Sequence, residues 1–158
     1  MKKIYRVFVE KRDGFNVESK NLYADIKAQL GLKELLSVRI ISRYDVCGID
    51  DSTFDKACKT IFAEPNADII SFEMPKAQHV IIRELQTGTY DQRADSAQQC
   101  IKMLSPESNP TVKTASIFIF EGKLKESDMD KLRHYLINPV ETREGSAEKP
   151  ESLTESVD

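Results

Sequence analysis

The sequence lacks tryptophan and has only 3 cysteines among its 158 residues. Cys47, Cys58 and Cys100 are widely spaced and odd in number, and no C-x-x-C pair is present. This pattern excludes a zinc ribbon and does not indicate a disulfide framework. We therefore expect reduced thiols in the protein core, as is typical of a cytoplasmic protein.

Long apolar runs are also missing. Charged residues between Arg6 and Arg12 interrupt the apolar residues that follow Met1, so the sequence predicts neither a secretion signal nor a membrane span. The net charge of −3 argues against a dedicated nucleic-acid binder, because such proteins usually carry a basic patch. We expect neither nucleic acid nor a membrane among the partners of this chain.

None of the common catalytic motifs is present. The sequence contains no G-x-x-x-x-G-K-[ST] phosphate loop, no G-x-G-x-x-G fingerprint, no H-E-x-x-H metal motif and no G-x-S-x-G nucleophile turn. The two histidines, His79 and His134, are far apart in the sequence, and we expect surface or packing roles for both. The residues alone therefore predict no catalytic, metal-binding or cofactor-binding site in this chain.

Short strands and helices alternate along the chain. Apolar alternation predicts strands at residues 4–9, 38–46, 67–72, 79–85 and 112–120. Amphipathic patterns predict one helix that ends at Gly31, one after an N-cap at Asp50, one after the turn at Gly88, and one that begins with a capping box from Ser127 to Asp130.

The second half of the chain repeats the plan of the first at an offset of 74 residues. Gly88 follows Gly14 by this offset (88 − 14 = 74), and Pro139 follows Pro65 (139 − 65 = 74). Side-chain identity between the halves is low, so a chance coincidence of two common chain breakers is the alternative. The order of the predicted elements also agrees, which favours an internal duplication.

We predict an α+β fold in which two ferredoxin-like β-α-β-α-β halves form a fused pseudo-dimer. The halves span about residues 1–75 and 76–140, and a third strand is clear only in the first. Each half-sheet has one bare face, so the halves can cover each other's bare faces or join edge to edge. Residues 141–158 are acidic and nearly free of apolar residues, which predicts a disordered tail or the start of a linker.

Five polar side chains gather where the third predicted helix begins. An apolar rhythm at Ala94, Ala97 and Ile101 gives this helix a face to bury, but core packing does not require the polar residues before it. They could cap the helix and complement its dipole, or they could form a docking surface on which an arginine binds a partner carboxylate. The residues alone do not decide between these readings for Tyr90, Asp91, Gln92, Arg93 and Asp95.

The stretch Tyr90–Cys100 resembles a signature near the N-terminus of the large, single-chain phosphoribosylformylglycinamidine synthase family. Three further stretches are similar to the same region and occur in the same order: Tyr44–Ile49 followed by Phe54, then Lys59–Pro65, then Tyr135–Val140. The resemblance covers about residues 5–144, which is almost the whole chain.

The resemblance implies a small-subunit-like N-terminal domain, residues 1–140, of an ATP-dependent, glutamine-hydrolysing C–N ligase of de novo purine biosynthesis. In that family a glutaminase domain releases ammonia, and a synthetase domain uses ATP and magnesium to activate formylglycinamide ribonucleotide. The N-terminal domain is non-catalytic and bridges the two for ammonia transfer. We therefore expect synthetase and glutaminase domains or chains as partners, and no activity of this chain alone. The alternative is a free-standing ferredoxin-like ligand-binding or regulatory module.

Overall fold

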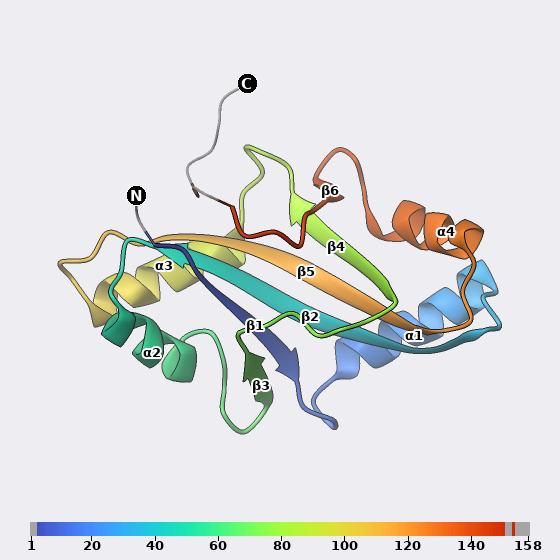
Figure 1. The fold of residues 1–158 in the computed structure, drawn as a ribbon, viewed down its shortest axis with the longest axis horizontal. Coiled ribbons are helices and arrows are strands. Elements are labelled where there is room, and N and C mark those ends of the chain that lie inside the picture. The colour runs from blue at the N-terminus through green and yellow to red at the C-terminus, as the bar shows by residue number, and fades with distance from the viewer. Residues whose placement is uncertain (1–2, 151–152, 154–158) are drawn as a thin grey trace.

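The structure is a computed structural model that describes residues 3–150 and 153. Within these residues the fold is α+β, with one antiparallel sheet of six strands and four helices (Figure 1). The strands are β1 (Tyr5–Lys11), β2 (Leu35–Cys47), β3 (Asp68–Ser71), β4 (His79–Leu85), β5 (Thr111–Gly122) and β6 (Thr142–Glu144). The helices are α1 (Val17–Leu30), α2 (Asp51–Thr60), α3 (Gln92–Leu104) and α4 (Glu126–Leu136).

The strand order β3-β1-β2-β5-β4-β6 is symmetric about the middle of the sheet. Tyr5 on β1 pairs with Val46 on β2, and the residues 74 positions later, His79 and Phe120, pair on β4 and β5 (79 − 5 = 74 and 120 − 46 = 74). The pairing of β1 with β3 recurs in β4 and β6 at the same offset. The backbone therefore keeps the spacing that Gly14 and Gly88 indicate in the sequence.

The first three strands join the last three edge to edge through the pairing of β2 with β5. Ser42 pairs with Ser116, and these residues are themselves 74 positions apart (116 − 42 = 74), so they mark the centre of the sheet. The sequence left open whether the halves cover each other's faces or join edges, and the structure shows a continuous sheet.

The helices lie in pairs at the two ends of the sheet, with α2 and α3 at one end and α1 and α4 at the other (Figure 1). Apolar side chains of α2 and α3 pack on Val7 of β1 and Val112 of β5. Those of α1 and α4 pack on Val38 of β2 and Phe118 of β5. We call the side on which these helices pack the helix face. Within the described residues no helix is both long and apolar enough to cross a membrane.

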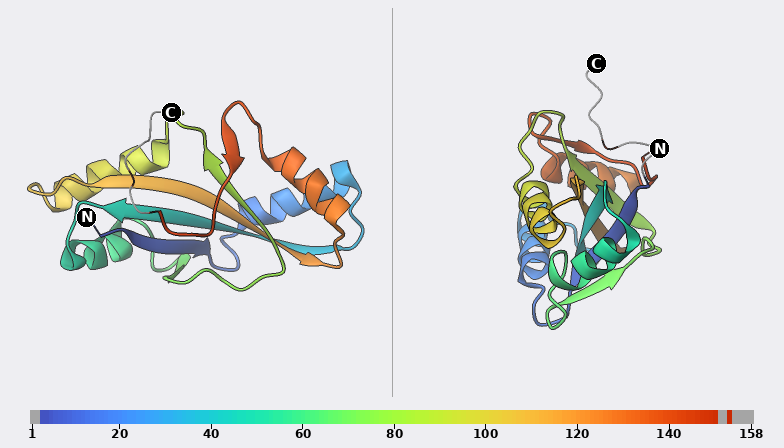
Figure 2. Two further views of the ribbon diagram at one scale, coloured as in Figure 1. Left: turned by 45° about the horizontal axis from the view of Figure 1, so that its top comes forward. Right: turned by 90° about the vertical axis from the view of Figure 1, so that its left-hand side faces the viewer.

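The opposite side of the sheet, the back face, is crossed by two irregular segments (Figure 2). The connection from β3 to β4, residues 72–78, places Met74 against an apolar cluster that includes Ile41 and Ile117. The segment after β6 crosses the other part of this face, where backbone carbonyls of Ser146 and Ala147 accept hydrogen bonds from arginines of the strands. Neither part of the back face is therefore bare.

The last helix begins earlier than the sequence predicted. The capping box expected from Ser127 to Asp130 is not formed, because the N-cap is Lys125, whose backbone N–H donates to Asp128 Oδ2 at 2.9 Å. Asp128 thus takes the third helical position, where an acidic side chain satisfies a free backbone donor. The N-cap predicted at Asp50 is confirmed, since its side chain accepts from the Thr53 N–H at 2.8 Å.

The sequence predicted a disordered tail or the start of a linker at residues 141–158, and the first part of this segment is ordered. Residues 142–144 form β6 and pair with β4, and Gly145 N donates to Ile82 O at 2.7 Å. Further along, Leu153 is buried against Ile4 and Cys47. Residues 151–152 and 154–158 of the predicted tail lie outside the described residues.

Replacing Phe62 with alanine tests the core between α2 and the sheet. Its ring is buried, and the centroids of the Phe62 and Tyr44 rings lie 4.8 Å apart. We therefore expect Phe62→Ala to lower the free energy of unfolding by about 3–5 kcal/mol. Urea denaturation followed by circular dichroism measures the change. Phe15→Ala is the matched control, because Phe15 is exposed and its loss should cost less than about 0.5 kcal/mol. Equal stability of Phe62→Ala and the parent would contradict this packing.

Candidate functional site

The start of α3 is fixed by Asp91. Its Oδ1 accepts from the Ala94 N–H at 2.9 Å, which caps the helix, while Oδ2 accepts from the Thr114 hydroxyl at 2.7 Å and the Thr114 N–H at 3.2 Å. A carboxylate at the N-cap satisfies a backbone donor that the helix leaves free. Asp91 therefore fastens α3 to β5 as well as starting it.

A second side chain of α3 helps to close the edge of β5. The pairing of β4 with β5 ends at Glu84 and Ala115, so the β5 backbone before Ala115 has no strand beside it on that side. Gln98 Oε1 accepts from the Val112 N–H at 2.9 Å, as Asp91 does from Thr114. The side chains of the N-cap Asp91 and of Gln98 in α3 thus replace the missing strand, which protects an otherwise open sheet edge.

Tyr90 and Asp95 form a small polar cluster at the surface. The Tyr90 side chain is 70% exposed, and its hydroxyl donates to Asp95 Oδ2 at 2.8 Å. Gln99, one turn later, donates to the same oxygen at 2.9 Å. The hydrogen bond to Asp95 raises the pKa of Tyr90, so the phenol stays protonated at neutral pH. The cluster leaves the aromatic ring of Tyr90 open to a partner.

Gln92 and Arg93 are exposed on another side of α3. Arg93 Nη1 donates to Ser42 Oγ at 3.0 Å, which draws the guanidinium toward the centre of the sheet. A hollow of about 520 Å³ lies beside it; we call this the α2–α3 groove. It is lined by Tyr44, Ile61, Gln92, Arg93, Ser96, Ala97 and Cys100.

The five predicted docking residues therefore do not form one surface. Successive residues on a helix point about 100° apart, so neighbours in sequence face different ways. Gln92 and Arg93 line the α2–α3 groove. Tyr90, Asp91 and Asp95 line a larger cavity of about 880 Å³ alongside the open part of β5, which we call the edge cavity.

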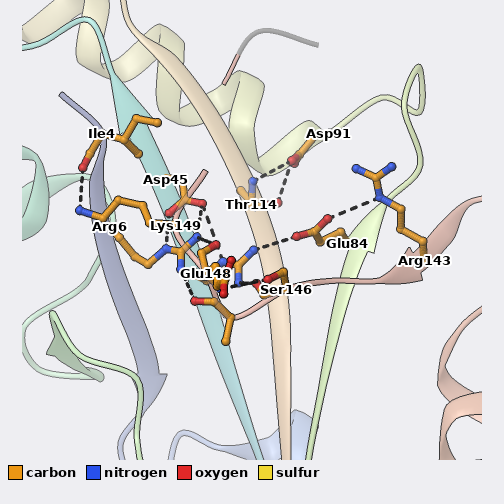
Figure 3. A network of polar contacts seen from close by, with 12 residues as sticks. Ile4, Arg6, Asp45, Glu84, Asp91, Thr114, Arg143, Ser146, Glu148 and Lys149 are labelled. Atoms are coloured by element: carbon orange, nitrogen blue, oxygen red, sulfur yellow. Dashed lines mark hydrogen bonds and ion pairs between the residues drawn. The ribbon is translucent and has the colours of Figure 1, made fainter. Parts of the chain in front are cut away.

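Beside the edge cavity the back face carries a buried ionic network (Figure 3). Arg6 donates to both carboxylate oxygens of Asp45, at 2.6 and 2.8 Å, and this pair is almost completely buried. The guanidinium of Arg6 also donates to the carbonyl oxygens of Ala147 and Glu148 at 2.8 and 3.2 Å. The strand residues thus bind the segment after β6 through its backbone.

Arg43 links the rest of the network. Its Nη2 donates to Glu84 Oε2 at 3.0 Å, and its Nη1 donates to the Ser146 carbonyl at 2.7 Å (Figure 3). Burial lowers the pKa of the Arg43 guanidinium and the adjacent Arg6 lowers it further, while Asp45 and Glu84 oppose that shift. With 4% of its surface exposed, Arg43 depends on these acceptors for the hydrogen bonds that it cannot make to water.

Sequence reasoning missed this network. Arg43 and Asp45 stand in a strand of alternating pattern, where a charged residue normally indicates the solvent side. The chain segment that covers them follows β6, a strand of only three residues without an apolar pattern. The only signal in the sequence is that Arg43 and Asp45 share one face of a strand with the apolar Ile41, which points to burial of that face.

The cysteines only partly match the expected core thiols. Cys47 and Cys58 are buried, but Cys100 is exposed and lines the α2–α3 groove. The expectation for Cys100 was wrong because the buried stripe of α3 passes through Ala97 and Ile101 and leaves Cys100 beside it. Within the described residues no group of three or more His, Cys, Asp or Glu side chains has the geometry to hold a metal ion.

A match to this chain is found neither among the protein-family models nor among the curated proteins.

Replacing Asp91 tests its double role. We expect Asp91→Ala to lower the free energy of unfolding by about 1–3 kcal/mol, because it removes an N-cap and the acceptor for Thr114. Urea denaturation measures the loss, and hydrogen exchange of the Thr114 amide should accelerate in the same variant. Asp95→Ala is the control on the same helix and should change stability by about 0.5 kcal/mol or less. A fully stable Asp91→Ala variant would show that the cap does not fasten α3.

Thiol labelling tests the placement of the cysteines. Burial, with a contribution from Asp55, raises the pKa of Cys58 to about 11, so its thiolate is scarce at neutral pH. Cys47 is buried and Cys100 is exposed. A disulfide reagent at neutral pH should therefore react rapidly with one thiol in the native protein, and Cys100→Ser should abolish that phase. Rapid reaction of a second thiol would contradict the structure.

Proposed function

We propose that this chain is a non-catalytic assembly domain of phosphoribosylformylglycinamidine synthase, which bridges the synthetase and glutaminase domains for ammonia transfer in de novo purine biosynthesis. The observation that carries the proposal is the exposed α2–α3 groove, which gathers Gln92 and Arg93 of the signature stretch. The resemblance of Tyr90–Cys100 to the family signature agrees with it.

We also propose that the two halves are ferredoxin-like units fused into a pseudo-dimer. The element order β-α-β-α-β occurs twice, and the strand pairings of the first half recur at an offset of 74 residues in the second (79 − 5 = 74 in the β1–β2 and β4–β5 pairings). A chance coincidence of two glycines and two prolines would not preserve the register of two separate strand pairings. A fused pair suits an assembly role, since one chain then presents two ends to two neighbouring modules.

The α2–α3 groove has the chemistry of a docking surface. Tyr44 and Ile61 supply apolar area, and Arg93 supplies a guanidinium of which Nη1 is held by Ser42. An arginine held in place loses less side-chain entropy when it binds a carboxylate, and its planar group can bind both oxygens. A partner that brings an acidic residue beside an apolar one would fit this groove.

Catalysis belongs to other parts of the proposed enzyme. In the family that the sequence resembles, ATP and magnesium act in the synthetase domain, and glutamine hydrolysis takes place in the glutaminase domain. We expect this chain to have no activity alone. Its contribution is to hold those domains in the arrangement in which ammonia passes from one to the other.

Replacing Arg93 tests the proposal. We expect Arg93→Ala to weaken binding of the chain to synthetase and glutaminase parts about tenfold or more, because a charge-assisted hydrogen bond contributes about 1.5–3 kcal/mol. Calorimetry with the separate parts measures the affinity. In the complete enzyme, glutamine hydrolysis should become less coupled to product formation.

The stability of Arg93→Ala should change by less than about 0.5 kcal/mol, because the side chain is exposed. Lys102→Ala is the matched control, since it removes a cation from the last turn of the same helix. Unchanged binding and coupling in Arg93→Ala would count against the groove as the docking site.

The alternative function is a free-standing ligand-binding or regulatory module. The edge cavity favours it, because its volume of about 880 Å³ lies in the range of small-molecule sites. A module of this kind would bind a small molecule and show no affinity for synthetase or glutaminase chains. Calorimetry with those chains separates the two functions.

A further inference from the structure

The two halves of the back face carry different chemistry at corresponding positions. Positions 74 residues apart occupy the same place in the strand pairings of the two halves. In the first half three of them are charged and form the buried network of Figure 3, whereas their counterparts are apolar. The pairs are Arg6 and Val80, Arg43 and Ile117, and Asp45 and Ile119.

The strand pairing of the sheet does not require this network. Ile117 and Ile119 show that apolar side chains serve the same strand positions, and both are buried. Replacement of buried ion pairs by well-packed apolar residues is often neutral or stabilising, so stability alone does not explain Arg43 and Asp45. The charged half of the back face therefore has a role beyond packing.

A row of residues across four strands forms the edge of a polar site. Arg43 pairs with Ala115, Ala115 with Glu84, and Glu84 with Arg143. Residues directly opposite each other on antiparallel strands point to the same face. Because Ala115 is small, Arg43 reaches across it to Glu84. The position in the first half that corresponds to Ala115 holds the larger Ile41. Arg43, Glu84 and Arg143 then line the edge cavity.

The carboxylates nearest this row are already engaged. Both oxygens of Asp45 accept from Arg6. Glu84 Oε2 accepts from Arg43, and Oε1 lies 3.4 Å from Arg143 Nε. Asp91, on the α3 side of the cavity, uses one oxygen for its own helix and the other for Thr114.

Among residues 3–150 and 153, the cations that line the cavity have hydrogen-bond donors that no described acceptor uses. Arg143 contacts Glu84 through Nε, and Figure 3 shows the rest of its guanidinium pointing away from the network. Lys113 lines the same cavity and is paired with Asp45 across β5 and β2, which places it one row from Arg43. A planar fork and an ammonium group next to engaged carboxylates favour a ligand that brings negative oxygens.

We propose that the edge cavity binds a small molecule through a phosphate or carboxylate group held by Arg143 and Lys113. Arg43 and Glu84 form the fixed wall of this site, and the segment after β6 forms a second wall through Ser146 and Lys149. The Arg6–Asp45 pair holds that segment in place. Asp95 and Glu148 also line the cavity and disfavour an anionic group in their immediate neighbourhood.

Binding of simple oxyanions to the full chain tests the site. Sodium phosphate and sodium succinate are titrated separately at constant ionic strength, with sodium chloride as the reference, and backbone amide shifts are followed by NMR. We expect saturable shifts at residues 84–91, 111–114 and 143–149 with a Kd at or below about 1 mM for one of the two anions. Phosphate and succinate distinguish the two kinds of ligand group.

Two variants locate the binding group. Lys113→Met and Arg143→Met should each weaken binding about tenfold or more, because each removes a charge-assisted hydrogen bond. Lys123→Met, an exposed lysine outside the cavity, should bind as the parent does. Melting temperatures show whether the variants fold, and Arg143→Met, at an exposed position, keeps the test valid if Lys113→Met does not.

Linear shifts without saturation, or the same shifts with chloride, would overturn the site. So would unchanged affinity in the folded variants. These outcomes do not depend on the assembly role. Binding to synthetase and glutaminase parts is tested in a separate experiment, with Arg93→Ala in the α2–α3 groove.

Discussion

The structure depends on the antiparallel pairing of β2 with β5, which runs from Leu35 and Gly122 to Cys47 and Thr111. Both strands are longer than their outer neighbours β1 and β4, and each extends furthest past its neighbour at its N-terminal end, before Ile41 on β2 and before Ala115 on β5. A strand end without a neighbour exposes backbone donors and acceptors that must find partners. On β5 these partners are side chains of α3, and this requirement sets where α3 begins and which of its residues face outward.

This constraint acts on the polar stretch at the start of α3 through its N-cap, Asp91. Both carboxylate oxygens of Asp91 accept hydrogen bonds from its own helix or from β5, so Asp91 positions the helix. Gln92 and Arg93 follow it and turn toward the α2–α3 groove, while Tyr90 and Asp95 turn toward the edge cavity. The helix-cap reading of the sequence is confirmed for Asp91, whereas the docking reading stays a prediction.

The elements with a strong local pattern could be predicted from the sequence, including the N-cap at Asp50 and the helix end at Gly31. The spacing of Gly14 and Gly88 also agrees with the strand register. What could not be predicted depends on contacts between distant segments. β6 has three residues and exists because β4 offers it an edge, and the Arg43 network is buried only because the chain after β6 crosses it. The sequence also did not show that the five predicted docking residues are divided between two hollows.

Comparison of the two halves separates what the fold needs from what it does not. Where corresponding positions share a property, as Glu10 and Glu84 do, the common architecture is a sufficient explanation, and each of these carboxylates pairs with an arginine of β2. Where they differ, as Arg43 and Ile117 do, packing explains only Ile117. An isoleucine fills this strand position without the cost of burying a charge. The charged member also needs the segment after β6 to supply acceptors, so network and segment must be kept together. The segment after β3 covers the corresponding positions of the other half with an apolar contact of Met74, so the fold can cover this face without buried charge. Our proposal that the cavity binds an anionic group therefore explains the polar wall better than the stability of the sheet does.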